Sequence, residues 1–275
     1  MAGNVPIDLT VINALALVEL ADRREVPVFR GSVRPMVKTL VTAEYVHGPT
    51  GLDGADLPAP AISESSGHAV DRIIEIVMGR DDVTLCTLGP LTNVGLALVR
   101  EPRIAGRVKE LVMMGGGFFE GGNTTPVAEF NVFVDPHAAH VVFSSGIPIV
   151  MMPLDVTHKA LAHPDRLQRF KELGTRAGDA VHGMLDFYDR WDMEKYGTPG
   201  APIHDAAVIS YLLDPTIYAG KEVYVEIEAA PGPTQGMTIV DWWAVTGSAP
   251  NATVINQVDG DRFFDLLVDR IGRLE

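Results

Sequence analysis

Cysteine is nearly absent from this sequence of 275 residues, because Cys86 is the only one. A single cysteine excludes an intrachain disulfide and favours an intracellular, cytoplasmic location. The apolar run around Cys86 predicts that it is a buried thiol on a strand. The sequence also lacks the roughly 18 uninterrupted apolar residues of a membrane span, and its first residues lack the features of a secretory signal. These absences predict a soluble cytoplasmic protein.

Positive charge is scarce as well. Lys and Arg number 22 against 36 Asp and Glu, which gives a formal net charge of -14. This charge repels the phosphates of nucleic acids and anionic membranes, and we expect neither as a partner. A small substrate, uncharged or assisted by a cation, fits better. Acidity also keeps a protein soluble whatever its substrate, so charge excludes partners without choosing one.

Three common motifs are missing. The glycine-rich segment His47 to Gly54 has neither the Lys nor the Ser/Thr arrangement of a P-loop. The segment Gly115 to Glu120 follows a predicted strand, but Glu120 stands at the third glycine position of a dinucleotide fingerprint. The GxSxG elbow of α/β-hydrolase esterases is absent too.

The sequence does contain short β-branched runs that alternate with segments of helical spacing. This alternation predicts the α/β class, with an open, mostly parallel sheet wrapped by helices around a Rossmann-like core. The hydrophobic content of 47% suits one large core, and we expect a single domain over residues 1–275. Strands are expected at residues 26–29, 83–88, 110–114, 147–154, 223–227, 237–240 and 253–255. Helices are expected at residues 7–21, 70–78, 92–99, 135–143, 166–173, 180–191, 204–213 and 261–271, the first of them largely buried.

Polar residues follow several of the predicted strands. Ligands of open α/β sheets bind at the carboxyl ends of the strands, so the loops after Leu88, Met114 and Leu154 are candidate sites. After Met114 come Asn123, Glu129 and Asn131, two amides and a carboxylate that suit the hydroxyl groups of a sugar. The alternative is that these three are ordinary loop residues around a tight glycine turn.

A second candidate is the pair His204 and Asp205, at the start of an apolar segment with helical spacing. A helix N-terminus with two titratable groups can bind charge or deliver a proton. The alternative is that Asp205 only caps the helix and His204 has no role, because Asp is a preferred N-cap residue.

Six short motifs occur along the chain: AGN at residues 2–4, HGPTGL at 47–52, GPLTN at 89–93, MGGG at 114–117, AEFN at 128–131 and HD at 204–205. Each motif alone is weak, but their order is specific. This ordered set resembles the inosine-uridine preferring nucleoside hydrolases, and the resemblance runs from Ala2 to the last predicted helix. It implies the nucleoside hydrolase fold and cleavage of the N-glycosidic bond of ribonucleosides to ribose and free base.

The resemblance also implies residue roles. His204 would donate a proton to the departing base, and Ca²⁺ would bind Asp205 and the backbone carbonyl of Leu88. Met114 would lie beneath the sugar, and Trp191 would be a further candidate near the base. The ribose would contact Asn4, Asn123, Glu129, Asn131 and Asp205, and the base would contact His47, Phe130 and Tyr188. The choice between purine and pyrimidine bases stays open, and the family implies a homodimer or homotetramer.

One departure from the family is serious. The family opens with a strand and a DxDxxxDD cluster whose aspartates hold calcium and activate water, and the sequence given begins at Met1 without them. We therefore expect an N-terminally truncated family member that lacks its first strand. Since calcium takes roughly six to eight oxygen ligands, its site would be incomplete and the activity impaired. The alternative is a non-catalytic relative that binds nucleosides or stabilises an oligomer.

Overall fold

The computed structural model describes residues 3–274, except for the side chains of residues 189–196. The strands are β1 (Val83–Thr87), β2 (Val108–Met114), β3 (Ile149–Met152), β4 (Leu161–Ala162), β5 (Ala201–Pro202), β6 (Tyr218–Ile227), β7 (Thr238–Asp241) and β8 (Ala252–Val258). The helices are α1 (Ile7–Leu20), α2 (Glu44–His47), α3 (Ala69–Gly79), α4 (Thr92–Arg100), α5 (Phe130–Val134), α6 (Pro136–Phe143), α7 (Leu154–Thr157), α8 (Pro164–Lys171), α9 (Arg176–Tyr196), α10 (Ala206–Leu213) and α11 (Gly260–Ile271). Two short 3₁₀ turns cover Pro102–Gly106 and Pro215–Ile217.

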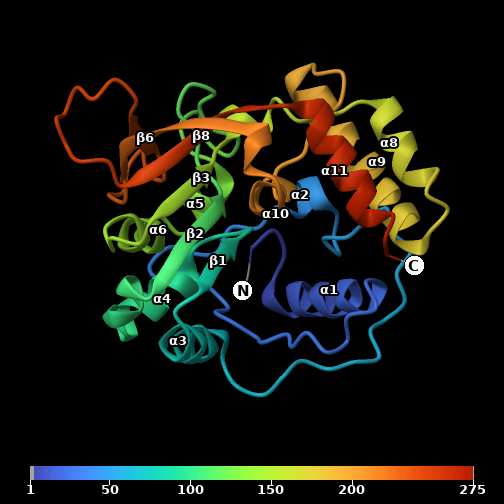
Figure 1. The fold of residues 1–275 in the computed structure, drawn as a ribbon, viewed down its shortest axis with the longest axis horizontal. Helices are drawn as coiled ribbons and strands as arrows, with labels where there is room; N and C mark the ends of the chain where they lie inside the picture. The colour runs from blue at the N-terminus through green and yellow to red at the C-terminus, as the bar shows by residue number, and fades with distance from the viewer. Residues whose placement is uncertain (1–2, 275) are drawn as a thin grey trace.

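Six strands form one twisted sheet in the order β1-β2-β3-β8-β6-β7 (Figure 1). The first four are parallel, whereas β6 and β7 are antiparallel to their neighbours. β4 and β5 make a separate antiparallel pair. The expected α/β class with a mostly parallel sheet is therefore confirmed.

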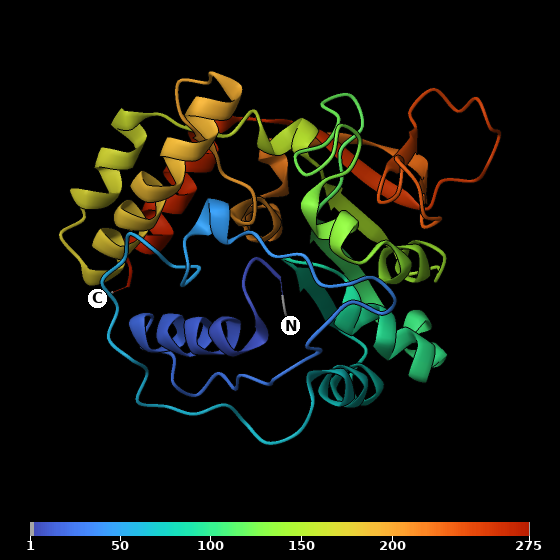
Figure 2. The same cartoon turned by 180° about the vertical axis from the view of Figure 1, so that it is seen from behind.

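The centre of the sheet is buried on both faces. Leu111 and Met113 of β2 point to the core that α3, α4 and α6 cover, whereas Val112 and Met114 point to the core beneath α7 and α10. Successive side chains of a strand alternate between faces, so a strand covered on both sides must be apolar throughout. Figure 2 shows the same layers from behind, with α8, α9 and α11 grouped at one end. This arrangement leaves the carboxyl ends of β1, β2 and β3 on one edge of the sheet.

The edge of the sheet differs from the sequence prediction in two ways. Cys86 was expected to be buried, but it is exposed on β1. Within residues 3–274, β1 pairs only with β2, so apolar composition alone overstated its burial. The expected strand at residues 26–29 is also wrong, because only Phe29 forms an isolated bridge, to Ser65.

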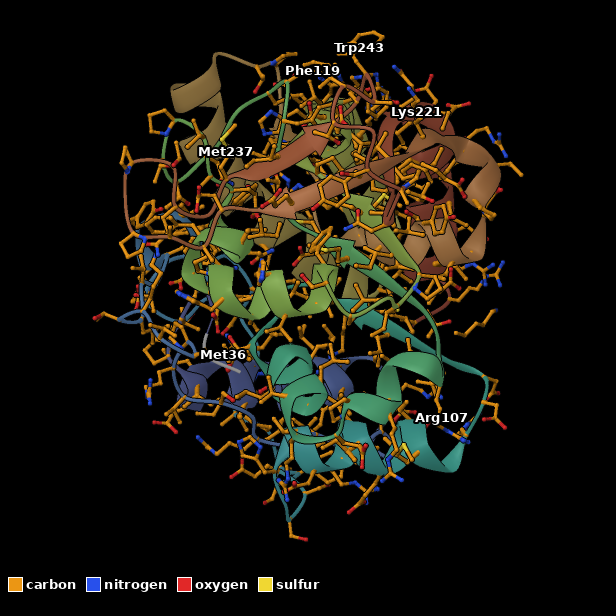
Figure 3. All side chains as sticks on the ribbon, turned by 90° about the vertical axis from the view of Figure 1, so that its left-hand side faces the viewer. Met36, Arg107, Phe119, Lys221, Met237 and Trp243 are labelled. Atoms are coloured by element: carbon orange, nitrogen blue, oxygen red, sulfur yellow. The ribbon has the colours of Figure 1, made fainter. Side chains whose placement is uncertain are left out.

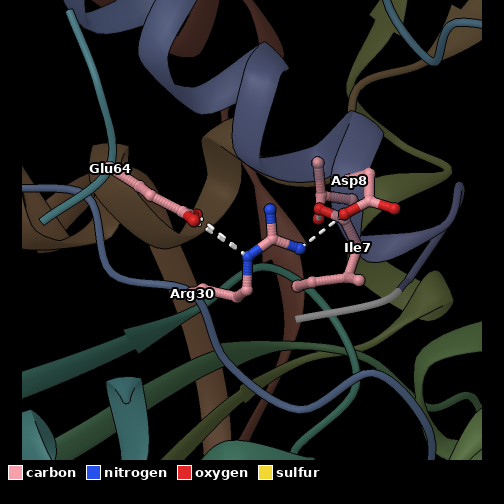
Figure 4. A network of polar contacts seen from close by, with 5 residues as sticks. Ile7, Asp8, Arg30 and Glu64 are labelled. Atoms are coloured by element: carbon pink, nitrogen blue, oxygen red, sulfur yellow. Dashed lines mark hydrogen bonds and ion pairs between the residues drawn. The ribbon is translucent and has the colours of Figure 1, made fainter. Parts of the chain in front are cut away.

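Helix α1 is confirmed, but the expectation that it is largely buried is wrong. It packs Ile7, Val11 and Leu15 against side chains from the following loops, while Ile12 and Leu17 are 47% and 37% exposed. A helix that packs on loops, as α1 does, has less of its surface covered than a helix that packs on a sheet. Arg30 ties the start of α1 to a later loop through ion pairs with Asp8 and Glu64 (Figure 4).

Other boundaries moved by a few residues. The strand expected at 147–154 is confined to β3, since Leu154 already begins helix α7. The segment around Glu129 and Asn131, which could have been an ordinary loop, instead starts helix α5.

In the described part of the chain, no helix is both long enough and apolar enough to cross a membrane. The side chain of Trp191, a candidate near the base, lies outside the described residues.

Candidate active site

A cavity of about 470 Å³ opens at the carboxyl ends of the parallel strands. Leu88 follows β1, Met114 ends β2, and α7 follows β3, so the position agrees with the rule for open α/β sheets. Helix α2, helix α9 and the start of α10 complete the wall. Apart from Trp191, whose side chain is not described, the cavity is lined by the site residues that the sequence predicted: Asn4, His47, Leu88, Met114, Asn123, Glu129, Phe130, Asn131, Tyr188, His204 and Asp205.

Asp205 occupies the N-cap position of α10, but its side chain makes no capping hydrogen bond. The interpretation that Asp205 serves merely as a cap is therefore unsupported. Its side chain lines the cavity and the residue is exposed there. The protein atoms packed around the carboxyl group, and then the negative charge of Glu129, raise the pKa of Asp205 to about 7. A carboxyl group so placed favours a ligand that donates hydrogen bonds or carries positive charge.

Glu129 is buried, with only 2% of its surface exposed. It caps α5, and its carboxylate accepts hydrogen bonds from the backbone N–H groups of Gly116 (2.8 Å) and Asn131 (3.0 Å). Burial raises the pKa of Glu129 to about 7, although these hydrogen bonds act in the opposite direction. The glycine turn after β2 and the start of α5 thus fix this carboxylate in the cavity wall.

The two amides lie beside Glu129. Asn123 accepts a hydrogen bond from the backbone N–H of Phe130 at 2.9 Å, which ties the loop after β2 to α5. Asn131 donates through Nδ2 to the carbonyl oxygen of Met114 at 3.2 Å. At the other end of the chain, the backbone carbonyl of Asn4 accepts from Ala43 at 2.7 Å. Backbone contacts therefore set the places of all three asparagines on the cavity wall.

His204 also lines the cavity, next to Asp205 in the sequence. Its Nδ1 is 2.7 Å from Oγ1 of Thr157, and the ring of Tyr188 meets it edge-on with centroids 6.5 Å apart. Burial, then the nearby imidazoles of His158 and His47, lower the pKa of His204 to about 3. At neutral pH the imidazole is therefore uncharged.

His47 and Tyr188 form an aromatic wall next to His204. Their rings are stacked, with centroids 5.5 Å apart and an interplanar angle of 15°. Burial lowers the pKa of His47, so this ring also favours its neutral form. A flat, uncharged heterocycle fits beside such a wall.

Helix α7 supplies positioning contacts that the sequence did not reveal. Asp155 accepts hydrogen bonds from the backbone N–H groups of Phe118 (2.9 Å), Phe119 (2.8 Å) and Glu120 (3.1 Å). The next residue but one, Thr157, contacts His204. The only available signal was that residues 154–157 follow a buried strand, because the partners are distant in sequence. The first part of the loop after β2 carries Phe118 and Phe119, whose rings contact the ring of Trp242. Figure 3 shows Phe119 and Trp243 at the same end of the molecule.

The fold and the cavity define an α/β enzyme with a site for a small polar ligand at the end of its sheet. The family model for inosine-uridine preferring nucleoside hydrolase matches residues 1–265, and the chain belongs to this family. The predicted enzyme class, a nucleoside hydrolase that acts on the N-glycosidic bond of ribonucleosides, is thereby confirmed.

Relatives in sequence and structure agree. An uncharacterized protein of Schizosaccharomyces pombe is 47% identical over 100% of this chain and 89% of its own length. The pyrimidine-specific ribonucleoside hydrolase RihA of Salmonella typhi is 43% identical over 98% of this chain and 87% of its own. The purine-preferring ribonucleoside hydrolase from Gardnerella vaginalis superposes with a TM-score of 0.92 at 30% identity, covering 99% of this chain and 88% of that one.

Calcium is the metal on which the family depends. Among the described residues, no group of three His, Cys, Asp or Glu side chains is arranged to hold a metal. Asp205 and the carbonyl of Leu88 are two oxygen donors at the cavity, whereas Ca²⁺ takes roughly six to eight. The described residues alone therefore do not fit a calcium ion.

Proposed function

We propose that this chain hydrolyses the N-glycosidic bond of pyrimidine ribonucleosides to ribose and the free base. The observation that carries the proposal is that one cavity is lined both by the polar residues around Glu129 and by the rings around His204. A ribonucleoside has the matching halves, a sugar rich in hydroxyl groups and a flat base.

The reaction adds water across the bond between the anomeric carbon and the base nitrogen. The hydroxyl group goes to the sugar and the proton goes to the base. Cleavage passes through a state in which positive charge develops on the ribosyl ring, so negative or dipolar groups near the sugar lower the barrier. Asp205 and Glu129 are carboxylic groups on that side of the cavity, and His204 serves the departing base.

The other residues of the cavity bind the two halves of the substrate. The contacts of four of them support this division, because Asn123 and Asn131 adjoin the segment of Glu129, whereas the ring of Tyr188 adjoins those of His47 and His204. We assign the ribose to Asn4, Asn123, Glu129, Asn131 and Asp205, the underside of the sugar to Met114, and the base to His47, Phe130 and Tyr188.

Pyrimidine nucleosides are the favoured substrates because the RihA relatives, which are named pyrimidine-specific, share about 43% of their residues with this chain. The purine-preferring relative with a solved structure shares 30%. In a family whose members divide by base, greater identity favours the shared preference. The structure itself adds a stacked aromatic wall that accepts either kind of base.

Calcium enters the proposal as a weak ligand. When bound, it would supply positive charge next to the sugar hydroxyls and the attacking water, with Asp205 and the carbonyl of Leu88 among its ligands. The two donors fall short of the number that calcium needs. We therefore expect the 275-residue chain to bind calcium weakly and to turn over nucleosides slowly.

The test measures ribose released from uridine, cytidine and inosine by the 275-residue chain, with added calcium and with a chelator. Slow release, faster from uridine and cytidine than from inosine and increased by calcium, is the expected result. Asp205→Asn is the matched control, because it removes the charge with little change in size. Binding of uridine without ribose release at any calcium concentration would instead support the non-catalytic, nucleoside-binding alternative.

A further inference from the structure

Thr157 is buried at the end of α7, with 1% of its surface exposed, and it contacts His204 across 47 positions of sequence. The contact joins Oγ1 of Thr157 to Nδ1 of His204 at 2.7 Å. The two nitrogens of an imidazole lie on different edges of the ring. With Nδ1 occupied by Thr157, Nε2 is the nitrogen that remains for a ligand in the cavity.

The direction of this hydrogen bond decides what His204 can do. If the hydroxyl donates to Nδ1, the neutral ring carries its proton on Nε2 and presents a donor to the ligand. If Nδ1–H donates to the hydroxyl, a neutral ring presents a bare Nε2, which can only accept. Only the first arrangement lets a neutral imidazole stabilise a departing base.

The surroundings of the hydroxyl favour the first arrangement. Within residues 3–274, Nδ1 of His204 is the only hydrogen-bond partner of Thr157 Oγ1. If Nδ1–H were the donor, the hydroxyl proton of Thr157 would be buried without an acceptor. Leaving a buried donor unsatisfied is unfavourable, whereas donation to Nδ1 satisfies both groups with one bond.

We propose that Thr157 is a positioning residue that donates its hydroxyl proton to Nδ1 of His204 and so holds the tautomer with hydrogen on Nε2. This inference rests on the proposed function for its catalytic meaning. The Nε2–H group then donates a hydrogen bond to the departing base and stabilises the negative charge that develops there. The attacking water gives its hydroxyl group to the sugar and its proton to the base, so His204 ends the reaction in the state in which it began.

The first experiment determines the tautomer of His204 independently of catalytic activity. Nitrogen-15 NMR of the histidine-labelled 275-residue chain distinguishes protonated from unprotonated ring nitrogens, and His204→Gln identifies the His204 signals. We expect Nε2 of His204 to be protonated and Nδ1 to be an acceptor. Thr157→Ser should keep this pattern, whereas Thr157→Val should lose the hydrogen-bonded Nδ1 signal. A protonated Nδ1 in the unmodified chain, or an unchanged signal in Thr157→Val, would overturn the proposal.

Thr92→Val is the matched control. Thr92 is also a fully buried threonine whose hydroxyl makes a 2.7 Å hydrogen bond, but its partner is Asp135. This variant should lower the melting temperature as Thr157→Val does and should leave the His204 signals in place. If Thr92→Val shifted them equally, the effect would belong to general loosening of the fold, and Thr157 would have no specific role.

The second experiment measures kinetics. Thr157→Val should lower kcat for uridine about 10- to 100-fold, the range for removing a group that orients a functional imidazole, with little change in KM. Thr157→Ser, which keeps the hydroxyl group, should retain most of the kcat of the unmodified chain. A p-nitrophenyl riboside, whose leaving group is already stable as an anion, should be affected much less. Equal losses on both substrates would overturn the role of Thr157. Absence of turnover in the unmodified chain would instead contradict the proposed function, and the NMR result would still decide the tautomer.

Discussion

The pKa values of titratable groups on the two sides of the cavity are shifted in opposite directions, and both shifts favour the uncharged form. On the polar side, burial raises the pKa of Glu129 to about 7, and the protein atoms packed around the carboxyl group of Asp205, which faces the cavity, raise its pKa to about 7. On the aromatic side, burial lowers the pKa of His204 to about 3 and also lowers that of His47. One physical cause therefore disfavours both negative and positive charge. Such a cavity suits an uncharged ligand whose groups act through hydrogen bonds and stacking.

The two sides also differ in how they are built. Glu129 accepts backbone N–H groups at the start of α5, so short-range structure holds it. His204 and Tyr188 come from separate elements, and the side-chain contacts of His204 join it to Tyr188 on α9 and to Thr157 on α7. The polar side should therefore tolerate side-chain changes elsewhere, whereas the aromatic side should depend on a few specific partners.

The largest expected effect tests the aromatic side. Replacing His204 with alanine should slow hydrolysis of inosine or uridine by about 10²- to 10⁴-fold, the range for removing an acid–base group. A p-nitrophenyl riboside should lose far less, because its leaving group departs without help. The measurement is kcat/KM for both substrates, and the loss for the nucleoside is divided by the loss for the p-nitrophenyl riboside. Equal losses would mean that His204 orders the start of α10 or binds ribose.

A smaller effect is expected from the stacked pair. Tyr188→Leu should raise KM for uridine by up to about tenfold, since aromatic pairs contribute about 0.5–1.5 kcal/mol beyond burial. Tyr188→Phe keeps the ring and is the matched control, with KM close to that of the unmodified chain. Steady-state kinetics on both variants would check this. If both variants raised KM for uridine equally, the hydroxyl group of Tyr188 rather than its ring would be responsible.

The opposite pKa shifts predict opposite slopes of stability with pH. A histidine whose pKa is lowered on folding takes up its proton first in the unfolded chain, so His47 stabilises the fold fully above its ordinary pKa of 6.5 and less as the pH falls below it. Glu129 behaves in reverse, and its contribution declines as the pH rises from 4.5 towards 7. Denaturant melts at several pH values give the free energy of unfolding as a function of pH. His47→Gln should lose the decrease in stability below pH 6.5, and Glu129→Gln should lose the decrease between pH 4.5 and 7. If stability depended on pH in the same way in the unmodified chain and in both variants, the opposite pKa shifts of His47 and Glu129 would be contradicted.

The smallest effect is expected far from either wall. Cys86 is exposed on β1, so Cys86→Ser should change the free energy of unfolding by no more than about 0.5 kcal/mol. A thermal melt gives the answer. A loss of several kcal/mol would mean that Cys86 is buried after all, as its apolar neighbours first suggested.

The sequence predicted the central layers of the fold well, because local pattern and tertiary environment agree there. Residues 111–114 are apolar on both faces, and the structure buries this part of β2 on both faces. The pattern failed at residues 26–29 and at Cys86, where burial depends on which strand lies alongside. No local rule contains that information.

The site was predictable only in part. The residues named from the motifs line one cavity, although their individual roles stay predictions. Asp155 and Thr157 were missed, since each acts through a partner far away in sequence: Asp155 through backbone amides at 118–120, and Thr157 through His204. A buried polar residue next to a strand looks like any other until its partner is known.

The single turn of α7 has a consequence for how the protein opens locally. One carboxylate, Asp155, holds three successive amides of the loop that precedes Asn123. Withdrawal of this one side chain releases all three amides to solvent at the same time. The loop and α7 should therefore open together as one cooperative unit. Hydrogen exchange would show this as equal protection of residues 118–120, and that protection would vanish together in Asp155→Asn.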